Sequence, residues 1–106
     1  MILNRTASVW RMIGTPSSFV ETQVYGSVRC AIIPISSLDV QQPYAFQSTH
    51  VVWMPFWAEL MKEDQIRWGR RKDRYGNVTP WVYFVVGRRD FREGPRQLAW
   101  YAQERD

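Results

Sequence analysis

Cysteine is nearly absent from this chain: Cys30 is the single one in 106 residues. One cysteine cannot form a disulfide within the chain or a zinc site with several thiolates, so the framework of a small secreted domain is excluded. The opening segment MILNRTASVW lacks a sustained apolar stretch, and no run reaches the roughly 18 apolar residues that a membrane-spanning helix needs. We therefore expect an intracellular protein without a signal peptide or a membrane span.

Patterns of known catalytic sites are also lacking. His50 is the only histidine, a catalytic role would need a positioned partner, and its neighbour Thr49 points to the other face of a strand. Cys30 alternates with Val28 and Ile32, which is typical of a small core side chain. The carboxylates show no acid–base or hard-metal spacing, and no glycine-rich phosphate loop occurs. We predict no enzymatic activity, no cofactor, no metal site and a structural or surface role for His50.

Aromatic residues, in contrast, are abundant. They make up 15% of the chain, with six Trp, five Tyr and five Phe, and their large area suits a small sheet protein. Apolar residues at 45% and charged residues at 23% are ordinary for a globular chain. This length supports one core but not two, so we predict a single domain over residues 1–106.

Strand signals dominate the chain. Alternating apolar residues and turn punctuation predict six short strands, at 6–13, 22–35, 48–57, 65–69, 81–87 and 96–103. One or two helical turns are expected within 56–64, and Gly26 indicates either a bulge or a close backbone approach in the second strand. The fold class is therefore all-β, a small barrel or sandwich.

The fifth predicted strand, WVYFVVG, is the strongest. One of its two faces is expected to centre the core, either Val82, Phe84 and Val86 or Trp81, Tyr83 and Val85. A polar connection over residues 70–80 precedes it, with a turn at Tyr75-Gly76-Asn77.

A long connection covers residues 35–48. Compact domains usually join their elements with roughly 4–6 residues, so a connection of this length without helical period is either functional or disordered. We favour a functional loop.

Positive charge is concentrated in one part of the sequence. The net charge is +4, yet nine basic residues lie between Arg67 and Arg96 against three acidic ones, and Arg outnumbers Lys twelve to two. Arg favours planar pairing with carboxylate or phosphate. The stretch 70–74 is either a solvated hairpin tip or a contact for acidic protein or DNA phosphates. The candidate basic patch comprises Arg70, Arg71, Lys72, Arg74, Arg88, Arg89 and Arg92.

The order of these segments resembles the small head-completion proteins of long-tailed double-stranded DNA bacteriophages, also called head-to-tail adaptors or stoppers. The matching segments, which cover most of the chain, are ASVWRMI, the run ending in Ile33-Pro34-Ile35-Ser36, the long glutamine-rich loop, THVVWMPF, the polar turn with Asp64 before DQIRWG, WVYFVVG, the turn through Asp90 and a last strand with Leu98. Two features differ from the family: the connection 70–80 is longer and more basic, and the aromatic content is higher.

The resemblance implies a non-enzymatic β-barrel that forms a homo-oligomeric ring, commonly twelve-fold, in the virion neck. It would be assembled in the bacterial cytoplasm, with a portal or adaptor ring above it, a tail terminator or tail tube protein below it and packaged double-stranded DNA in its channel. No membrane or small-molecule substrate is implied. The long loop becomes the candidate channel gate, in which Leu38 and Val40 would seal the closure and the polar side chains would hydrogen-bond between copies; these are Ser36, Asp39, Gln41, Gln42 and Tyr44.

The residues also support an alternative function. A small basic β-barrel can bind nucleic acid through a basic hairpin and nearby aromatic side chains. Tyr75 and Trp81 are candidates for stacking on bases, although the aromatics of WVYFVVG are needed in the core. Such a protein would bind oligonucleotides as a monomer, whereas a stopper would form rings or join a larger particle.

Overall fold

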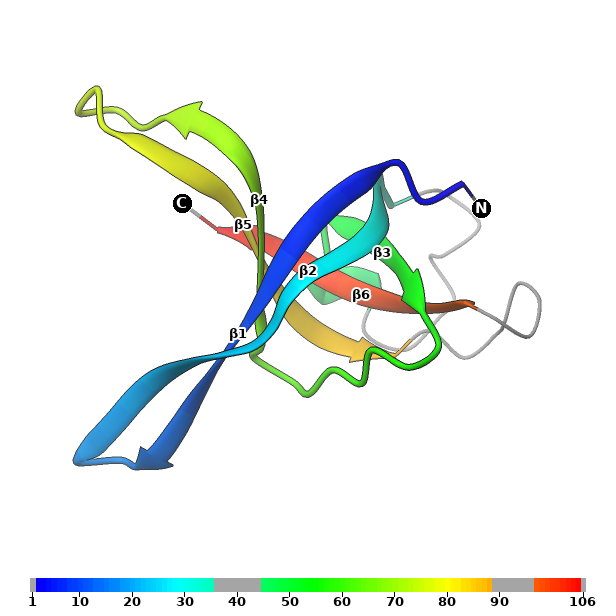
Figure 1. Ribbon diagram of the computed structural model, residues 1–106. Coiled ribbons are helices and arrows are strands. Elements are labelled where there is room, and N and C mark those ends of the chain that lie inside the picture. The colour runs from blue at the N-terminus through cyan, green and yellow to red at the C-terminus, as the bar shows by residue number, and fades with distance from the viewer. Residues whose placement is uncertain (1, 36–44, 89–96, 106) are drawn as a thin grey trace.

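The computed structural model describes residues 2–35, 45–88 and 97–105. The described chain is all-β and antiparallel, with one short 3-10 turn, η2 (Ala45–Gln47). The strands are β1 (Arg5–Thr15), β2 (Ser18–Pro34), β3 (His50–Pro55), β4 (Gln65–Lys72), β5 (Val78–Arg88) and β6 (Gln97–Arg105). Their order is β1-β2-β3-β6-β5-β4, and pairing of β1 with β4 closes a barrel (Figure 1). The predicted fold class is confirmed.

The barrel interior holds the main core. Alternate residues of a strand point to the same face, and Tyr83 and Val85 of β5 point inward while Trp81 packs at the margin of the core. The second of the two faces predicted for this strand therefore lines the interior. Cys30 is fully buried in the same cluster, which confirms its prediction as a core side chain. Burial raises the pKa of its thiol to about 11.

A second apolar cluster covers the outside of the barrel over β2, β3 and β6. Trp53 and Tyr101 are its largest buried members, and Val86 of β5 belongs to it. Ala45 of η2 is buried in this cluster, and Ile35 packs against it. The two described ends of the long connection are thus anchored on the outer surface of the barrel, and β3 is buried on both faces.

The segment 56–64 contains turns and no helix, so the predicted helical turns are wrong. Its backbone is held by β5 instead, because Glu63 donates its N–H to the carbonyl of Val85 at 2.8 Å and Val85 donates its own N–H to the carbonyl of Asp64 at 2.9 Å. Ala58 and Leu60 of this segment fill the barrel interior. Pairing with a neighbouring strand has replaced the hydrogen bonds of a helix.

The predicted bulge at Gly26 is confirmed by the register of β1 and β2. Ala7 lies opposite Val28 and Val9 lies opposite Tyr25, so two residues of β2, Gly26 and its neighbour, face one residue of β1. Such an extra residue bends the strand and increases its twist.

Two hairpin arms extend beyond the barrel, both toward the left in Figure 1. β1 pairs with β4 over Ala7 to Trp10, and its pairing with β2 continues further, to the turn between Thr15 and Ser18. We call residues 11–22 the apolar arm. The β4–β5 pairing likewise extends to Lys72, beyond the Val82–Arg88 stretch of β5 that pairs with β6, and we call residues 69–80 the basic arm.

Candidate functional site

An outward-facing row of aromatic and arginine side chains crosses β1, β4, β5 and β6. The cross-strand register places Trp10 opposite Gln65 and Arg67 opposite Val82. From β5 to β6 it places Val82 opposite Arg105. Ile66, between Gln65 and Arg67, is buried in the interior, so its two neighbours point outward. We call this surface the arginine–aromatic face; its members are Trp10, Arg67, Val82, Phe84 and Arg105.

The arginines of this face stack on its aromatic rings. The guanidinium carbon of Arg67 lies 4.7 Å from the centroid of the Trp10 ring, and that of Arg105 lies 4.2 Å from the Phe84 ring. Both distances are within the range of cation–π attraction. Burial lowers the pKa of the Arg67 guanidinium.

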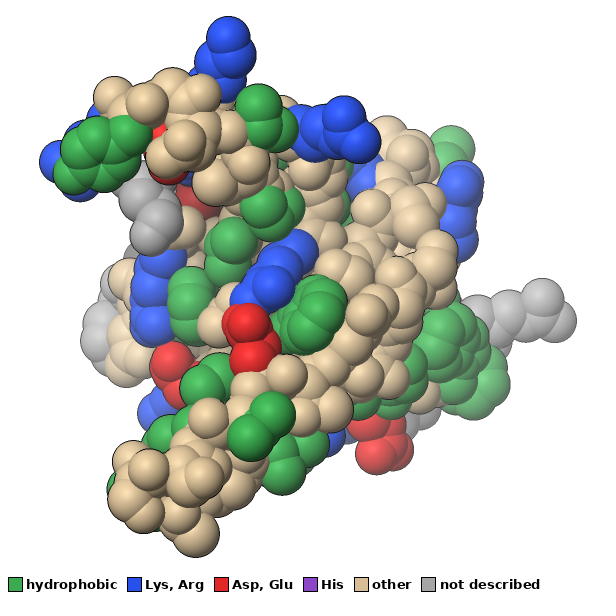
Figure 2. Space-filling view, turned by 60° about the vertical axis from the view of Figure 1, so that its left-hand side comes forward, with side chains coloured by type: hydrophobic (Ala, Val, Ile, Leu, Met, Phe, Trp, Pro, Cys, Tyr) green, Lys and Arg blue, Asp and Glu red, His purple; other side chains and the backbone are tan. Residues whose placement is uncertain are grey.

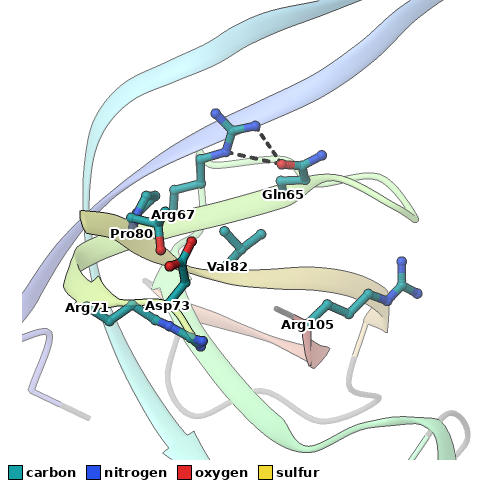
Figure 3. A pocket seen from close by; sticks show the side chains of 8 residues that line it. Gln65, Arg67, Arg71, Asp73, Pro80, Val82 and Arg105 are labelled. Carbon is teal, nitrogen blue, oxygen red and sulfur yellow. Dashed lines mark hydrogen bonds between the residues drawn. The ribbon is translucent and has the colours of Figure 1, made fainter. Parts of the chain in front are cut away.

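A hollow of about 310 Å³ opens beside this face, toward the basic arm (Figure 3). Three arginines line it, yet each has a carboxylate partner: Arg67 pairs with Glu21, Arg105 Nη1 lies 3.2 Å from Glu63 Oε2, and Arg71 Nη1 lies 3.9 Å from Glu104 Oε1. The remaining lining residues are Gln65, Asp73, Thr79, Pro80 and Val82. Because its cations are already paired, the hollow is a poor site for a small anion.

The turn of the basic arm is built around Asp73. Its Oδ1 accepts hydrogen bonds from the N–H groups of Tyr75 at 2.8 Å and Asn77 at 2.9 Å, and its carbonyl accepts from Gly76 at 3.0 Å. Gly76 has a φ of 83°, a left-handed conformation that favours glycine. The predicted turn at Tyr75-Gly76-Asn77 is confirmed, and the carboxylate of this arm is occupied by its own turn.

The cations of this arm are exposed. Among the described residues, Arg70, Lys72 and Arg74 have no carboxylate within ion-pair distance. The Arg74 guanidinium lies 5.7 Å from the centroid of the Tyr75 ring, and 78% of Tyr75 is exposed. Figure 2 shows Lys and Arg side chains over this upper arm, whereas the lower arm has hydrophobic side chains along its length and an uncharged outer end.

The apolar arm carries four large apolar side chains that the described chain leaves exposed. Met12, Ile13, Phe19 and Val20 are 47%, 50%, 51% and 61% exposed. Ile13 faces Val20 across the ribbon, so both lie on one of its faces. The turn depends on Gly14, whose φ is 132° and where a Cβ would lie 2.4 Å from the carbonyl oxygen of Ser18.

A second exposed apolar group lies on the segment after β3. Phe56, Trp57 and Met61 are 57%, 51% and 59% exposed; we call them the 56–61 patch. Trp57 packs edge-on against Tyr25 with ring centroids 5.7 Å apart, and Tyr25 Oη accepts a hydrogen bond from the N–H of Glu59 at 3.1 Å. The patch is therefore held in place by β2.

An ion pair between the half-buried Arg11 and the buried Asp64 joins this segment to the base of the apolar arm. Arg11 donates from Nε and Nη2 to the two carboxylate oxygens of Asp64, at 2.9 and 2.8 Å. Asp64 Oδ2 also accepts a hydrogen bond from the N–H of Met61 at 2.8 Å, and the Asp64 side chain is 1% exposed. The hydrogen bonds to Asp64 raise the pKa of the Arg11 guanidinium. Sequence reasoning missed this pair, because the two residues are far apart in sequence and neither carries a local signal for the other.

The structure divides the predicted basic patch. Arg70, Arg71, Lys72 and Arg74 lie together on the basic arm, but Arg88 ends β5 at the opposite end of that strand from Val78. Arg89 and Arg92 lie outside the described residues. All residues proposed for the channel gate also lie outside them, namely Ser36, Leu38, Asp39, Val40, Gln41, Gln42 and Tyr44.

His50 is packed against the core. Its ring lies edge-on to Tyr83 with centroids 4.9 Å apart, and its Nδ1 is 2.8 Å from Thr49 Oγ1. The same hydroxyl accepts a hydrogen bond from the N–H of Glu104 at 2.8 Å. Burial lowers the pKa of His50, and the charge of Glu104 opposes this effect. The expectation that Thr49 points away from His50 is wrong, because Thr49 precedes β3 and its hydroxyl contacts the imidazole. The contacts with Tyr83 and Thr49 fit the structural role expected for His50.

Within residues 2–35, 45–88 and 97–105, no cluster of three or more His, Cys, Asp or Glu side chains could hold a metal ion. No helix in these ranges has the length and apolar character needed to cross a bilayer. Comparison with models of known protein families, with curated proteins and with solved structures finds no match for the chain.

Proposed function

We propose that this chain is a structural subunit of the head-to-tail connector in the neck of a tailed bacteriophage and that it works as part of a ring. The apolar arm carries this proposal. A two-stranded ribbon that leaves the barrel with four exposed large apolar side chains has nothing within the described chain to bury them. By register, Ile13 and Val20 share one face of this ribbon and Met12 and Phe19 lie on the other. Large apolar side chains exposed together on a projecting element are typical of a binding site for another protein.

A second copy of the chain is the partner that fits this arm best. The apolar arm and the 56–61 patch together hold seven of the ten large apolar side chains exposed in the described chain. An arm that covers the patch of the next copy joins two different surfaces, and a repeated contact of this kind closes into a ring when its rotation permits. Two apolar surfaces on one chain thus supply both halves of a head-to-tail contact.

The mechanism of such a ring is steric. The resemblance to stopper proteins supplies the rest of the proposal: the ring sits below the portal, closes the DNA-filled head and presents a docking surface to the tail. The long loop 35–48 stays the proposed gate. Its described ends, Ile35 and Ala45, are packed on the outer surface of the barrel. Both attachment points of the proposed gate are therefore fixed on the barrel.

Cysteine cross-linking tests the contact between copies. Cys30 is fully buried, so cysteines introduced at Val20 and Met61 are the accessible thiols of the described chain. A mixture of the Val20→Cys and Met61→Cys variants should give cross-linked dimers that neither variant gives alone, because a disulfide needs the two Cα atoms within about 7 Å. The double variant should give a ladder of oligomers that ends at a closed ring.

The control pairs Val20→Cys with Ile2→Cys. Ile2 is 84% exposed and lies near the N-terminus, which is on the other side of the barrel from the arms (Figure 1). Random collision would cross-link this pair as well as the test pair. Equal yields from both pairs, or no ladder from the double variant, would refute the arm-to-patch contact.

The basic arm favours a second candidate function, a free nucleic-acid-binding barrel. Its exposed cations lie beside the exposed ring of Tyr75, a combination typical of proteins that bind single strands. The oligomeric state separates the two functions, because a free binder engages an oligonucleotide as a monomer. The Phe19→Ser variant should weaken ring formation and leave such binding intact.

A further inference from the structure

We infer that the basic arm is a binding site for the phosphate backbone of nucleic acid, read without regard to base sequence. The inference rests on the proposed function in one respect: in a connector ring, the backbone within reach is that of the packaged double-stranded DNA. The residues assigned to the contact are Arg70, Lys72 and Arg74, with Tyr75 beside them. Arg71 belongs to the base of the arm.

The first argument is the difference between three ion-paired arginines of the described chain and the cations at the tip of the arm. Arg67 pairs with Glu21, Arg105 with Glu63 and Arg11 with Asp64. Such pairs neutralise the guanidinium and stabilise the subunit itself. The three cations of the arm tip have no described carboxylate partner, and the local carboxylate, Asp73, already accepts two N–H groups of its own turn. Their charge is therefore available to a partner.

The second argument is the shape of the arm. The register of β4 and β5 shifts between Trp68 and Arg71, and Gly69 has a φ of 66° at this point. A bulge of this kind re-aims a hairpin, and here it directs the ribbon away from the barrel (Figure 1). A two-stranded ribbon has a width that the major groove of DNA admits.

The third argument is the placement of the side chains on the ribbon. Arg70 and Lys72 are two residues apart on β4 and share a face, and Arg74 follows in the turn. Tyr75, with Arg74 5.7 Å from the centre of its ring, lies in the same turn and is 78% exposed. The arm therefore offers charge along one side and an aromatic ring at the tip, which suits phosphates and sugars.

An acidic protein surface is the competing partner. Arg is the residue of choice for planar pairing with both carboxylate and phosphate, but an acidic protein interface usually buries its core residues together with apolar anchors. Val78 is the exposed large aliphatic side chain of the described arm, so the arm offers few aliphatic anchors to a protein partner. The chemistry of the tip therefore favours a polyanionic backbone over a folded protein surface.

Binding of the full chain to a mixed-sequence double-stranded DNA fragment tests this site. Fluorescence anisotropy should give an affinity whose logarithm falls with the logarithm of salt concentration, with a slope of about −0.9 per neutralised phosphate, or roughly −3 for three contacts. The variant Arg70→Gln, Lys72→Gln, Arg74→Gln should lose this binding and most of this slope. Scrambling the DNA sequence should change nothing.

A matched control removes the same charge elsewhere. The variant Arg5→Gln, Arg29→Gln, Lys62→Gln also loses three cations from exposed positions, none of them in the predicted basic patch, and it should bind DNA like the original chain. If both variants lose binding equally, the effect is one of net charge and the site is refuted. Circular dichroism of each variant verifies that the fold is kept.

Two further measurements identify the source of the backbone. Tighter binding of a single strand of equal length, lost in Tyr75→Ala, would assign the same phosphate contacts to single-stranded nucleic acid. Tighter binding of polyglutamate than of DNA would overturn the inference in favour of an acidic protein.

The outcome for this site is separable from the outcome for the ring. The arm variant should still form the Val20–Met61 cross-linked ladder, because the apolar arm is untouched. A chain that binds DNA through the basic arm but gives no ladder would contradict the proposed ring and leave this site intact. A chain that gives the ladder but binds no DNA would contradict this site and leave the proposed ring intact.

Discussion

Asp64 is the one charged side chain that is buried in the described core, and it connects three parts of the chain. Its carboxylate receives Arg11 from the base of the apolar arm and the N–H of Met61 from the 56–61 patch, and its carbonyl pairs with β5. A buried carboxylate is costly unless its hydrogen bonds are satisfied. The two surfaces proposed to join neighbouring copies thus depend on one residue for their relative position.

Replacement of Arg11 by Ala should destabilise the fold strongly. The change leaves the Asp64 carboxylate buried without its guanidinium, and breaking a buried pair in this way costs about 3–5 kcal/mol. Urea unfolding followed by circular dichroism measures the loss. Arg67→Ala is the control, because its partner Glu21 is 42% exposed and exposed pairs contribute about 0–1 kcal/mol. Equal losses in the two variants would mean that Asp64 finds other partners.

His50 should make the fold less stable in mild acid. Burial lowers the pKa of His50 in the folded chain below its ordinary value of 6.5, so the unfolded chain binds the proton more readily. The free energy of unfolding is therefore unaffected by this group at higher pH and falls as the pH drops below 6.5. The variant His50→Phe keeps a ring against Tyr83 and should lose this part of the pH dependence. Parallel stability curves for the two proteins between pH 7 and 5 would contradict the assignment.

At the scale of the elements, the two arms differ from the rest of the chain in how well the sequence predicts them. The barrel part of β1 alternates buried and less buried residues, while β3 and β6 have continuous buried runs. Both patterns are apolar enough for the sequence to predict a strand. The arms extend these strands where neither face is buried, so β2 begins at Ser18 instead of near residue 22. Ladder hydrogen bonds and turn residues, not burial, set the ends of these ribbons.

The same difference applies to the candidate surfaces. The cations of the basic arm are contiguous in sequence, so their grouping could be predicted, whereas Arg88 is carried to the far end of β5 by the length of that strand. The arginine–aromatic face depends on the register of β1, β4 and β5. No local pattern reveals a register between distant strands. The prediction of helical turns within 56–64 was wrong for a similar reason, because β5, a distant strand, supplies backbone hydrogen-bond partners there.

Gly14→Ala should disorder the apolar arm and leave the barrel intact. The new Cβ would lie 2.4 Å from the carbonyl oxygen of Ser18 in a backbone conformation that L side chains rarely adopt, and such strain costs about 1–3 kcal/mol. Hydrogen exchange should show faster exchange of amides in residues 11–22 and unchanged exchange in β3 and β6. Gly76→Ala is the comparison variant: it introduces the strain of a left-handed φ into the basic arm, but nothing lies within 4 Å of its Cβ position, so exchange in residues 11–22 should stay unchanged. Unchanged protection of the apolar arm would contradict the role given to Gly14.

Deletion of Leu38 to Tyr44 should leave the subunit stable. These residues lie outside the described ones, the flanking Ile35 and Ala45 keep their own packing, and a change in loop length alters closure entropy by only about 0.6 kcal/mol per doubling. If the loop is the gate, filled heads should leak DNA while the shortened protein still binds its site. Substitution of the same residues by a glycine–serine segment of equal length controls for strain in the shortened connection.

A shortened chain that no longer folds, while the glycine–serine version folds, would indicate only a strained connection. Two other results would count against the gate. Failure of both to fold would place these residues in the core, and full retention of DNA by particles that carry either version would remove the loop as the gate.

At the scale of the whole molecule, the two arms have opposite chemistry and leave the barrel on the same side of the view in Figure 1. One exposes apolar side chains, and the other exposes three cations that have no carboxylate partner among the described residues. A subunit that joins its neighbour through the first and contacts DNA through the second would combine assembly and DNA retention in one small barrel.

Native mass spectrometry of the purified chain over a series of concentrations tests the central claim, ring formation, most directly. We expect a discrete closed oligomer beside the monomer, with twelve copies if the resemblance to stoppers holds. The variant Phe19→Ser, Val20→Ser should remain monomeric with an unchanged circular dichroism spectrum, because substitutions at exposed positions usually change stability by only about 0.5 kcal/mol. A chain that stays monomeric at every concentration and binds oligonucleotides in that state would contradict the ring and support the nucleic-acid-binding barrel.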